Sequence, residues 1–152
     1  MSKGAGICAR ESAYLGRYVQ VGEAQGRVIS VSFPEAVDDA RREHDLLDRI
    51  DRYLEGTREE FDDVTVALTV PTDERAVLEA VRGIPYGDQV SCERLAGTTA
   101  GLDPDADEAG RTVRSALAEN PAPLLIPDHR VRDGPSAAPP PVEQKLRSVE
   151  GL

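Results

Sequence analysis

The chain has 152 residues, of which 39% are hydrophobic and 4% aromatic, and its formal net charge is −10. This length suits one compact domain or two small ones, and no apolar run approaches the roughly 20 residues of a membrane helix. Two cysteines do not make a disulfide framework, and the two cysteines and two histidines lack the tight spacing of a four-ligand structural zinc site. We therefore expect a soluble, cytoplasmic, monomeric protein with no membrane partner, no metal and no cofactor.

The charge balance is acidic, with 28 Asp and Glu residues against 18 Lys and Arg. Only Lys3 and Lys145 among the basic residues are lysines. Many acids, few lysines and few aromatic residues are typical of a halophilic protein. The alternative is an ordinary acidic protein whose charge keeps it soluble. Acidity ordinarily argues against nucleic-acid binding. That argument weakens in molar salt, where the counterion contribution to DNA affinity is already mostly lost.

The first half of the chain predicts an α/β arrangement. Residues 14–21 (YLGRYVQV) and 27–33 (RVISVSF) alternate like strands, and residues 23–26 form a hairpin turn between them. A helix is expected over residues 34–54, because apolar residues recur at helical spacing towards its end. Residues 64–70 (VTVALTV) are a further strand candidate.

The second half predicts helices, over residues 73–82, 92–98, 105–120 and 142–149. Ser91 and the Asp105–Glu108 pair supply capping signals for the second and third of them. These two helices and their tight loop fit a helix-turn-helix, for which a generic helical hairpin is the commoner explanation. The switch from alternating apolar residues to capped helices divides the chain into domains at residues 1–70 and 71–152.

Several short motifs follow one another in the second half. They are Ile84-Pro85-Tyr86-Gly87, Val90-Ser91 with Leu95-Ala96, Arg111-Thr112-Val113, Asn120-Pro121, Leu125-Ile126-Pro127-Asp128-His129-Arg130-Val131, and Glu150-Gly151. In this order and spacing the chain resembles the O6-alkylguanine-DNA alkyltransferases, which are methylated-DNA–protein-cysteine methyltransferases. The likeness covers most of the chain but is specific only after Ile84; residues 53–56 and 61–62 agree more loosely.

The resemblance implies an α/β N-terminal lobe of the ribonuclease-H-like type and an α-helical C-terminal lobe with a winged or helix-turn-helix DNA-binding motif. Members of this DNA repair family bind DNA through a recognition helix in the minor groove and flip the alkylated guanine out of the stack. A cysteine thiolate then takes the alkyl group, helped by a histidine that a glutamate orients. The implied partner is double-stranded DNA containing O6-alkylguanine.

The resemblance of the motifs implies roles for individual residues of this chain. His129 corresponds to the catalytic histidine and Glu150 to its orienting glutamate. Arg111 corresponds to the arginine that enters the duplex, and Asn120 to the asparagine that ties the recognition helix to the active-site turn. The plainer alternatives are a structural histidine, a solvated helix arginine and an ordinary helix C-terminal cap.

The chain departs from the family at the residue that defines its reaction. Asp128 stands where the nucleophilic cysteine is expected, and a carboxylate is a hard, weak nucleophile that cannot form the family's thioether. Cys92 replaces the base-flipping tyrosine, Arg114 replaces a small residue of the recognition helix, and the pocket loop is shortened around residues 135–140. We expect a candidate catalytic group at the base of a pocket, Asp128, His129 and Glu150, in which His129 lies between the two acids and within hydrogen-bonding reach of Glu150. We also expect a DNA-binding group, Arg111, Cys92, Arg114 and Asn120.

Three functions are compatible with this pattern. In the first, a repair protein senses O6-alkylguanine without normal methyl transfer and passes the lesion to a downstream repair protein, as cysteine-lacking alkyltransferase-like proteins do. In the second, Asp128 accepts the alkyl group as an ester that water, activated by His129, hydrolyses. In the third, a degenerate family member binds DNA or a protein partner without lesion specificity. We expect the first.

Overall fold

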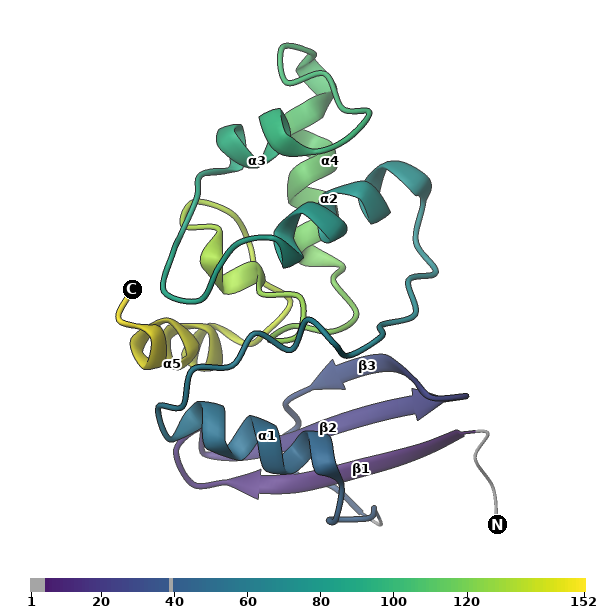
Figure 1. Cartoon of the computed structure of the whole chain (residues 1–152), viewed down its shortest axis with the longest axis vertical. Helices are drawn as coiled ribbons and strands as arrows, with labels where there is room; N and C mark the ends of the chain where they lie inside the picture. Colours follow the sequence, from purple (N-terminus) through teal and green to yellow (C-terminus); the bar gives the residue numbers. More distant parts are fainter. Residues whose placement is uncertain (1–4, 39) are drawn as a thin grey trace.

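A three-stranded antiparallel sheet, in the order β1-β2-β3, forms one layer of the molecule (Figure 1). The computed structural model describes residues 5–38 and 40–152, so the first four residues of the expected N-terminal domain lie outside the described part. The strands are β1 (Ala5–Ser12), β2 (Arg17–Ala24) and β3 (Arg27–Ser32). The turn between β2 and β3 contains Gly26, whose φ of 78° lies in the left-handed region that glycine adopts without strain.

Helix α1 (Asp45–Leu54) packs along one face of this sheet (Figure 1). Its buried residues recur at helical spacing, and they are Leu46, Leu47, Ile50, Tyr53 and Leu54. His44 caps the helix, because its Nδ1 accepts a hydrogen bond from the Leu46 N–H at 3.0 Å. The expected helix over residues 34–54 is therefore wrong in its first half. Within that half, Pro34 instead accepts a hydrogen bond from the Tyr18 N–H of β2 at 3.0 Å, and Arg41 lies beside β1, where the Ala9 N–H donates to its carbonyl at 2.8 Å.

Two strand predictions also need correction. The first predicted strand begins only at Arg17, and β1 precedes it in a segment for which no strand was expected. Residues 64–70 form no strand, since only Val66 pairs there, in a single bridge with Val28 of β3. The Val28 N–H and carbonyl make both bonds of that bridge, at 2.9 and 2.8 Å. The segment therefore pairs with the sheet edge at one position only.

Helices dominate the second half, as expected. They are α2 (Thr72–Arg82), α3 (Cys92–Thr98), α4 (Asp107–Ala118) and α5 (Pro140–Glu150). Helices α2, α3 and α4 pack together, while α5 lies nearer the sheet (Figure 1). Ser91 caps α3 as predicted, with its Oγ accepting from the Arg94 N–H at 3.1 Å. The predicted Asp105–Glu108 capping box does not form, because α4 begins at Asp107 and its N-cap, Ala106, has no side chain able to accept the bond.

The buried apolar side chains of both halves form one continuous cluster. Backbone contacts also join the halves, since the Val31 N–H of β3 donates to the Pro121 carbonyl at 2.9 Å. The fold thus consists of an α/β part and a helical part that share a core. The domain division at residue 70 and the ribonuclease-H-like and winged or helix-turn-helix descriptions stay predictions. None of the helices in the described residues is long and apolar enough to span a membrane.

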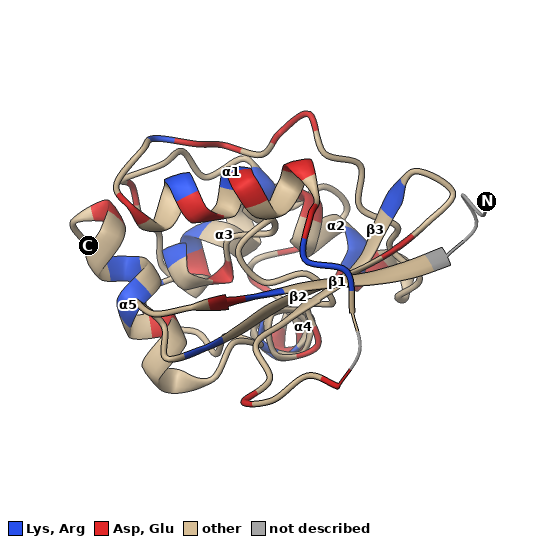
Figure 2. Cartoon of the chain, turned by 90° about the horizontal axis from the view of Figure 1, so that it is seen from below, with Lys and Arg blue, Asp and Glu red and all other residues tan. Residues whose placement is uncertain are grey.

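Positions of acidic and basic residues are mixed along α1 and α5 (Figure 2). On the α1 side many are paired: Arg10 bonds Asp48 and Asp51, each at 2.8 Å. Arg49 bonds Glu59 at 2.7 Å and Asp63 at 2.8 Å. Each of these arginines bonds two carboxylates, so both clusters keep an excess negative charge.

Candidate active site

The segment between α4 and α5 contains a tight turn that leads into Asp128 and His129. Leu124 in this turn has a φ of 84°, a left-handed conformation that is uncommon for a branched side chain, and it is buried. A short 3-10 helix, Asp128–Arg130, follows. Val90 fixes it from the other side, donating to the Arg130 carbonyl and accepting from the Arg132 N–H, both at 2.9 Å. The two site residues are thus held by backbone contacts on both flanks.

The Asp128 carboxylate is completely buried and accepts three hydrogen bonds. Oδ1 accepts from the Ser136 hydroxyl at 2.6 Å, and Oδ2 accepts from the Ala137 N–H at 2.9 Å and the Asn120 Nδ2 at 3.1 Å. Burial raises the pKa of Asp128 above its ordinary value, while these donors act in the opposite direction. The carboxylate therefore anchors the loop over residues 134–139 to the active-site turn.

Asn120 lies where the sequence predicted it, at the end of α4 and against the active-site turn. Its Nδ2 also donates to the Ile126 carbonyl at 2.9 Å, and its Oδ1 accepts from the Ala122 N–H at 3.0 Å. The side chain is buried, and each of its polar atoms has a partner. Asn120 therefore links the helix, the turn and the Asp128 carboxylate.

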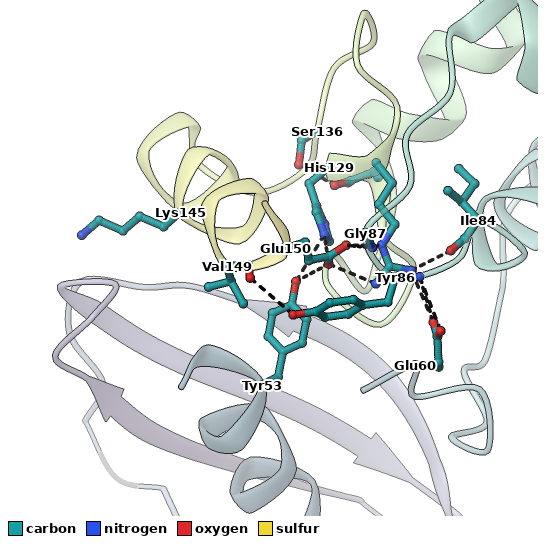
Figure 3. A network of polar contacts seen from close by, with 12 residues as sticks. Tyr53, Glu60, Ile84, Tyr86, Gly87, His129, Ser136, Lys145, Val149 and Glu150 are labelled. Atoms are coloured by element: carbon teal, nitrogen blue, oxygen red, sulfur yellow. Dashed lines mark hydrogen bonds and ion pairs between the residues drawn. The ribbon is translucent and has the colours of Figure 1, made fainter. Parts of the chain in front are cut away.

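His129 and Glu150 form a buried pair, with His129 Nε2 at 2.7 Å from Glu150 Oε2 (Figure 3). Three further groups donate to the same carboxylate. Arg130 donates through Nε at 2.8 Å and Nη2 at 3.0 Å, the Gly87 N–H donates at 3.0 Å, and the Tyr53 hydroxyl bonds Oε2. Burial alone would raise the pKa of Glu150, but His129 and Arg130 outweigh it and lower the pKa to about 2. Glu150 is therefore an ionised carboxylate that only accepts hydrogen bonds.

Two expectations about this group are only half met. His129 contacts Glu150 as predicted, but the Asp128 carboxylate bonds Ser136, Ala137 and Asn120 and not the imidazole ring. Asp128 and His129 are both completely buried, so in this conformation they do not form the floor of an open pocket. The reason is the 134–139 loop, whose hydroxyl and amide groups close over the carboxylate. A cavity of about 870 Å³ does exist between α2 and α3, but neither Asp128 nor His129 lines it.

Tyr53 and Arg130 are site residues that the sequence reasoning did not select. Both are buried, and Arg130 also donates to the Ile84 carbonyl at 2.6 Å. Arg130 was detectable, because it directly follows His129 in the quoted motif. Tyr53 lies in the loosely matching segment 53–56, where it was interpreted only as part of the apolar helix face.

The predicted DNA-binding residues fall into two groups. Arg111 and Arg114 are exposed on α4, although Arg114 Nη2 also donates to the Asp133 carbonyl at 3.2 Å. Cys92 differs from the expectation of a side chain aimed at DNA, because it is only 8% exposed. A Cβ added to Gly134 would lie 2.9 Å from its Sγ, so only a glycine fits against the thiol. Burial raises the pKa of Cys92 to about 11, and the thiol stays protonated at neutral pH.

One group of possible metal ligands occurs in the described residues, formed by Cys8, Glu23 and His44, whose ligand atoms lie within 4.8 Å of one another. Both imidazole nitrogens of His44 already have partners, Nδ1 in the α1 cap and Nε2 with Glu23 at 3.0 Å. The Arg41 guanidinium lies 3.7 Å from the Cys8 sulfur and places a positive charge there. These contacts explain the cluster without a cation, and the absence of a metal stays a prediction.

Comparisons with known proteins identify the helical part. Residues 73–138 match the family model "6-O-methylguanine DNA methyltransferase, DNA binding domain". A methylated-DNA–protein-cysteine methyltransferase of Methanopyrus kandleri is 38% identical over 88 residues, which are 58% of this chain and 62% of that protein. One of Metallosphaera sedula is 35% identical over 86 residues, or 57% and 51%. The matched segments thus span less than two thirds of these relatives.

Solved structures extend the likeness to the whole chain. O6-methylguanine methyltransferase of Mycobacterium tuberculosis superposes with a TM-score of 0.73 at 19% identity, over 95% of this chain and 90% of that one. The same organism's protein in complex with DNA gives 0.72 at 21% identity, over 96% and 91%. The Pyrococcus kodakaraensis KOD1 O6-methylguanine-DNA methyltransferase gives 0.68 at 19%, over 96% and 99%. Residues 73–138 therefore belong to the DNA-binding domain family of the 6-O-methylguanine DNA methyltransferases, in a chain that has the fold of these proteins.

Proposed function

We propose that this protein is a DNA repair factor that binds double-stranded DNA and senses O6-alkylguanine without taking the alkyl group onto itself. In this proposal it marks the lesion for a downstream repair protein. The DNA-binding domain family and the fold support the DNA-binding part. The cytoplasmic location, the monomeric state and the adaptation to high salt are parts of the same proposal.

The identity and setting of Asp128 carry the proposal. The motif around it places a carboxylate where the family's reaction needs a thiolate, and that carboxylate is saturated by three donors. The two cysteines of the chain offer no substitute, because Cys8 and Cys92 are both buried on other elements, β1 and α3. The His129–Glu150 pair is nevertheless intact. A His129–Glu150 pair beside a residue that cannot act as the nucleophile fits a protein that recognises the alkylated base better than one that repairs it.

On the DNA side, we propose that α3 and α4 act as a helix-turn-helix with α4 as the recognition helix. Arg111 is exposed on α4 and is available to enter the duplex in place of a flipped base. Arg114 lies on the same helix and holds the 134–139 loop through the Asp133 carbonyl. Asn120 then connects the end of this helix to the active-site turn.

The proposal is tested by measuring binding to two duplexes of identical sequence, one with guanine and one with O6-methylguanine, in molar potassium chloride. Tighter binding to the methylated duplex, with the methyl group still on the base afterwards, is the expected result. Loss of the methyl group would instead support ester formation on Asp128 followed by hydrolysis. Equal affinities would reject lesion sensing.

One observation favours a second candidate function. The 134–139 loop closes over Asp128 and leaves it no exposed surface. If the loop stays closed on DNA, the protein binds DNA or a protein partner without lesion specificity. The paired duplexes separate the candidates, because this second function predicts one affinity for both.

A further inference from the structure

We infer that Tyr53 is a positioning residue of the His129–Glu150 pair, supplied to the helical part by helix α1 of the α/β part. The inference rests on the proposed function for its meaning, since it concerns the same site. It assigns the α/β part a direct role in ordering that site.

Figure 3 shows Tyr53 pointing from α1 towards Glu150, with its hydroxyl at the carboxylate that also contacts His129. The hydroxyl donates to Glu150 Oε2, the same oxygen that faces His129 Nε2 at 2.7 Å. It also lies 3.4 Å from Nε2 itself. The hydroxyl, the carboxylate oxygen and the imidazole nitrogen therefore meet at one point, and all three side chains are buried.

The direction of each proton follows from the charge states. The pKa of Glu150 is lowered to about 2, so the carboxylate offers only lone pairs. Burial, together with the negative charge of Glu150, raises the pKa of Tyr53, so the phenol keeps its proton and donates it. Nε2 must then carry a hydrogen to bond the carboxylate, and in a neutral imidazole this leaves Nδ1 as the lone-pair nitrogen. Nδ1 is buried and has no hydrogen-bond partner among the described residues.

The ring of Tyr53 is held as firmly as its hydroxyl. It packs against Phe61 and edge-on against Tyr86, with ring centroids 5.9 Å apart in both pairs. The Arg130 guanidinium, which also bonds Glu150, stacks on Tyr86 at 5.7 Å. A side chain with a locked ring delivers its hydroxyl to one place, which is the condition for orienting another group. Tyr53 thus orients the Glu150 carboxylate and, through it, the His129 imidazole.

The site offers a matched control for this role. Tyr86 belongs to the same aromatic cluster and its hydroxyl also reaches α5, but it donates to the Val149 backbone carbonyl at 3.3 Å. Tyr53→Phe and Tyr86→Phe therefore remove the same atom from neighbouring rings. Only the first removal changes the carboxylate that contacts His129.

The experiment follows the His129 ring by ¹⁵N NMR in the full-length wild-type protein, without DNA. We expect the wild type to show the tautomer with the hydrogen on Nε2 and slow exchange of that hydrogen with water. Tyr53→Phe should accelerate this exchange roughly tenfold, the scale of losing one hydrogen bond. Tyr86→Phe should leave it within about twofold of the wild type, since its hydroxyl contributes nothing to the carboxylate.

Equal exchange in Tyr53→Phe and the wild type would overturn the inference, and so would a wild-type tautomer with the hydrogen on Nδ1. If Tyr53→Phe does not fold, the wild type still decides: the Tyr53 hydroxyl proton must show an Overhauser effect to the His129 Nε2 proton, and its absence counts against the role. Binding to the paired duplexes is measured beside this, with a severalfold loss of discrimination expected only for Tyr53→Phe. Equal binding of the wild type to the two duplexes would reject the proposed function. The NMR result would still test the positioning role of Tyr53 independently.

Discussion

At Asp128 the side chain accepts hydrogen bonds on both oxygens, whereas a thiolate in its place would accept fewer and longer ones. The difference reaches beyond nucleophilicity, because the donors Ser136 and Ala137 belong to the loop that closes over the site. A buried carboxylate costs free energy unless it is well hydrogen-bonded. The loop and the carboxylate therefore depend on each other.

The mutual dependence of Asp128 and its loop predicts a stability loss on Ser136→Ala. The change leaves one oxygen of a buried carboxylate without its 2.6 Å donor, so we expect a loss of roughly 1–3 kcal/mol in the free energy of unfolding. Urea denaturation measures it. The control is Ser148→Ala, at an exposed serine on α5, where a change within about 0.5 kcal/mol is expected. Equal losses in both variants would show that the hydroxyl bond to Asp128 contributes nothing.

The chemistry at position 128 is tested by Asp128→Cys. The wild type should gain no stable methyl group during incubation with O6-methylguanine duplex, since neither Cys8 nor Cys92 is exposed. The variant places a thiol next to the His129–Glu150 pair and should gain one methyl group slowly and in part of the molecules. Mass spectrometry of the intact protein detects both outcomes. A methyl group on wild-type Cys92 would contradict its buried placement.

Helix α4 combines an exposed arginine with an acidic start. Asp107 and Glu108 form its first turn, and the loop before it adds Asp103 and Asp105, all exposed. These acids stabilise the helix N-terminus electrostatically, yet they repel a DNA backbone. The cations of Arg111 and Arg114 therefore carry a disproportionate share of any attraction on this helix.

Replacing Arg111 by alanine should weaken duplex binding by about 1–2 kcal/mol, roughly a tenfold rise in Kd. Arg52→Ala removes the same side chain from an exposed position on α1 and should have little effect. Fluorescence anisotropy at several salt concentrations compares the two. The assignment of α4 as the recognition helix fails if both variants bind as the wild type does.

The elements that could be predicted are those whose determinants are local. Ser91 and the residues after it specify α3, and apolar spacing identifies α1 up to Leu54. The stretch over residues 34–44 was misassigned because its stabilising contact, Arg41 against β1, is tertiary. Val66 has β propensity but pairs at one position only, which no local pattern reveals.

The residues of the candidate site likewise divide into those that local motifs predict and those that depend on tertiary contacts. His129, Asn120 and Glu150 were found because they stand within short motifs. The hydrogen bond from Ser136 to Asp128 could not be predicted, since it depends on how a proline-rich loop folds back over Asp128. Nor could the partnership of Tyr53 with Glu150, which joins helices from opposite halves of the chain.

The whole molecule should lose stability in acid, and Glu150 contributes to that loss. Its pKa is about 2 in the folded protein against an ordinary 4.5, so the unfolded chain takes up the proton more readily. The resulting stabilisation, at most about 3 kcal/mol, is fully present above pH 4.5 and disappears as the pH falls towards 2. The pKa values of Glu59 and Asp63 are also lowered, by Arg49, and act in the same direction. Asp128, with its raised pKa, acts in the opposite direction and reduces the slope.

Urea denaturation of the wild type at successive pH values should therefore show a falling free energy of unfolding between pH 4.5 and 2. Glu150→Gln removes the buried counter-charge of the Arg130 guanidinium and leaves it only the more exposed Glu60, 3.8 Å away, which costs about 3–5 kcal/mol at neutral pH. Its pH dependence in the same window should be shallower. Glu79→Gln, at an exposed glutamate of α2, should follow the wild-type curve. Parallel curves for Glu150→Gln and the wild type would contradict the assignment.

The bond between Tyr53 and Glu150 also has a kinetic consequence, because it joins residues 97 positions apart in the chain. This single bond can form only after the two halves of the chain have come together, because its two residues meet through tertiary contacts alone. The hydroxyl bond should then be absent from the transition state. Stopped-flow measurements should find that Tyr53→Phe unfolds faster while its refolding rate is unchanged. The site would in that case be the last part of the protein to assemble and the first to come apart.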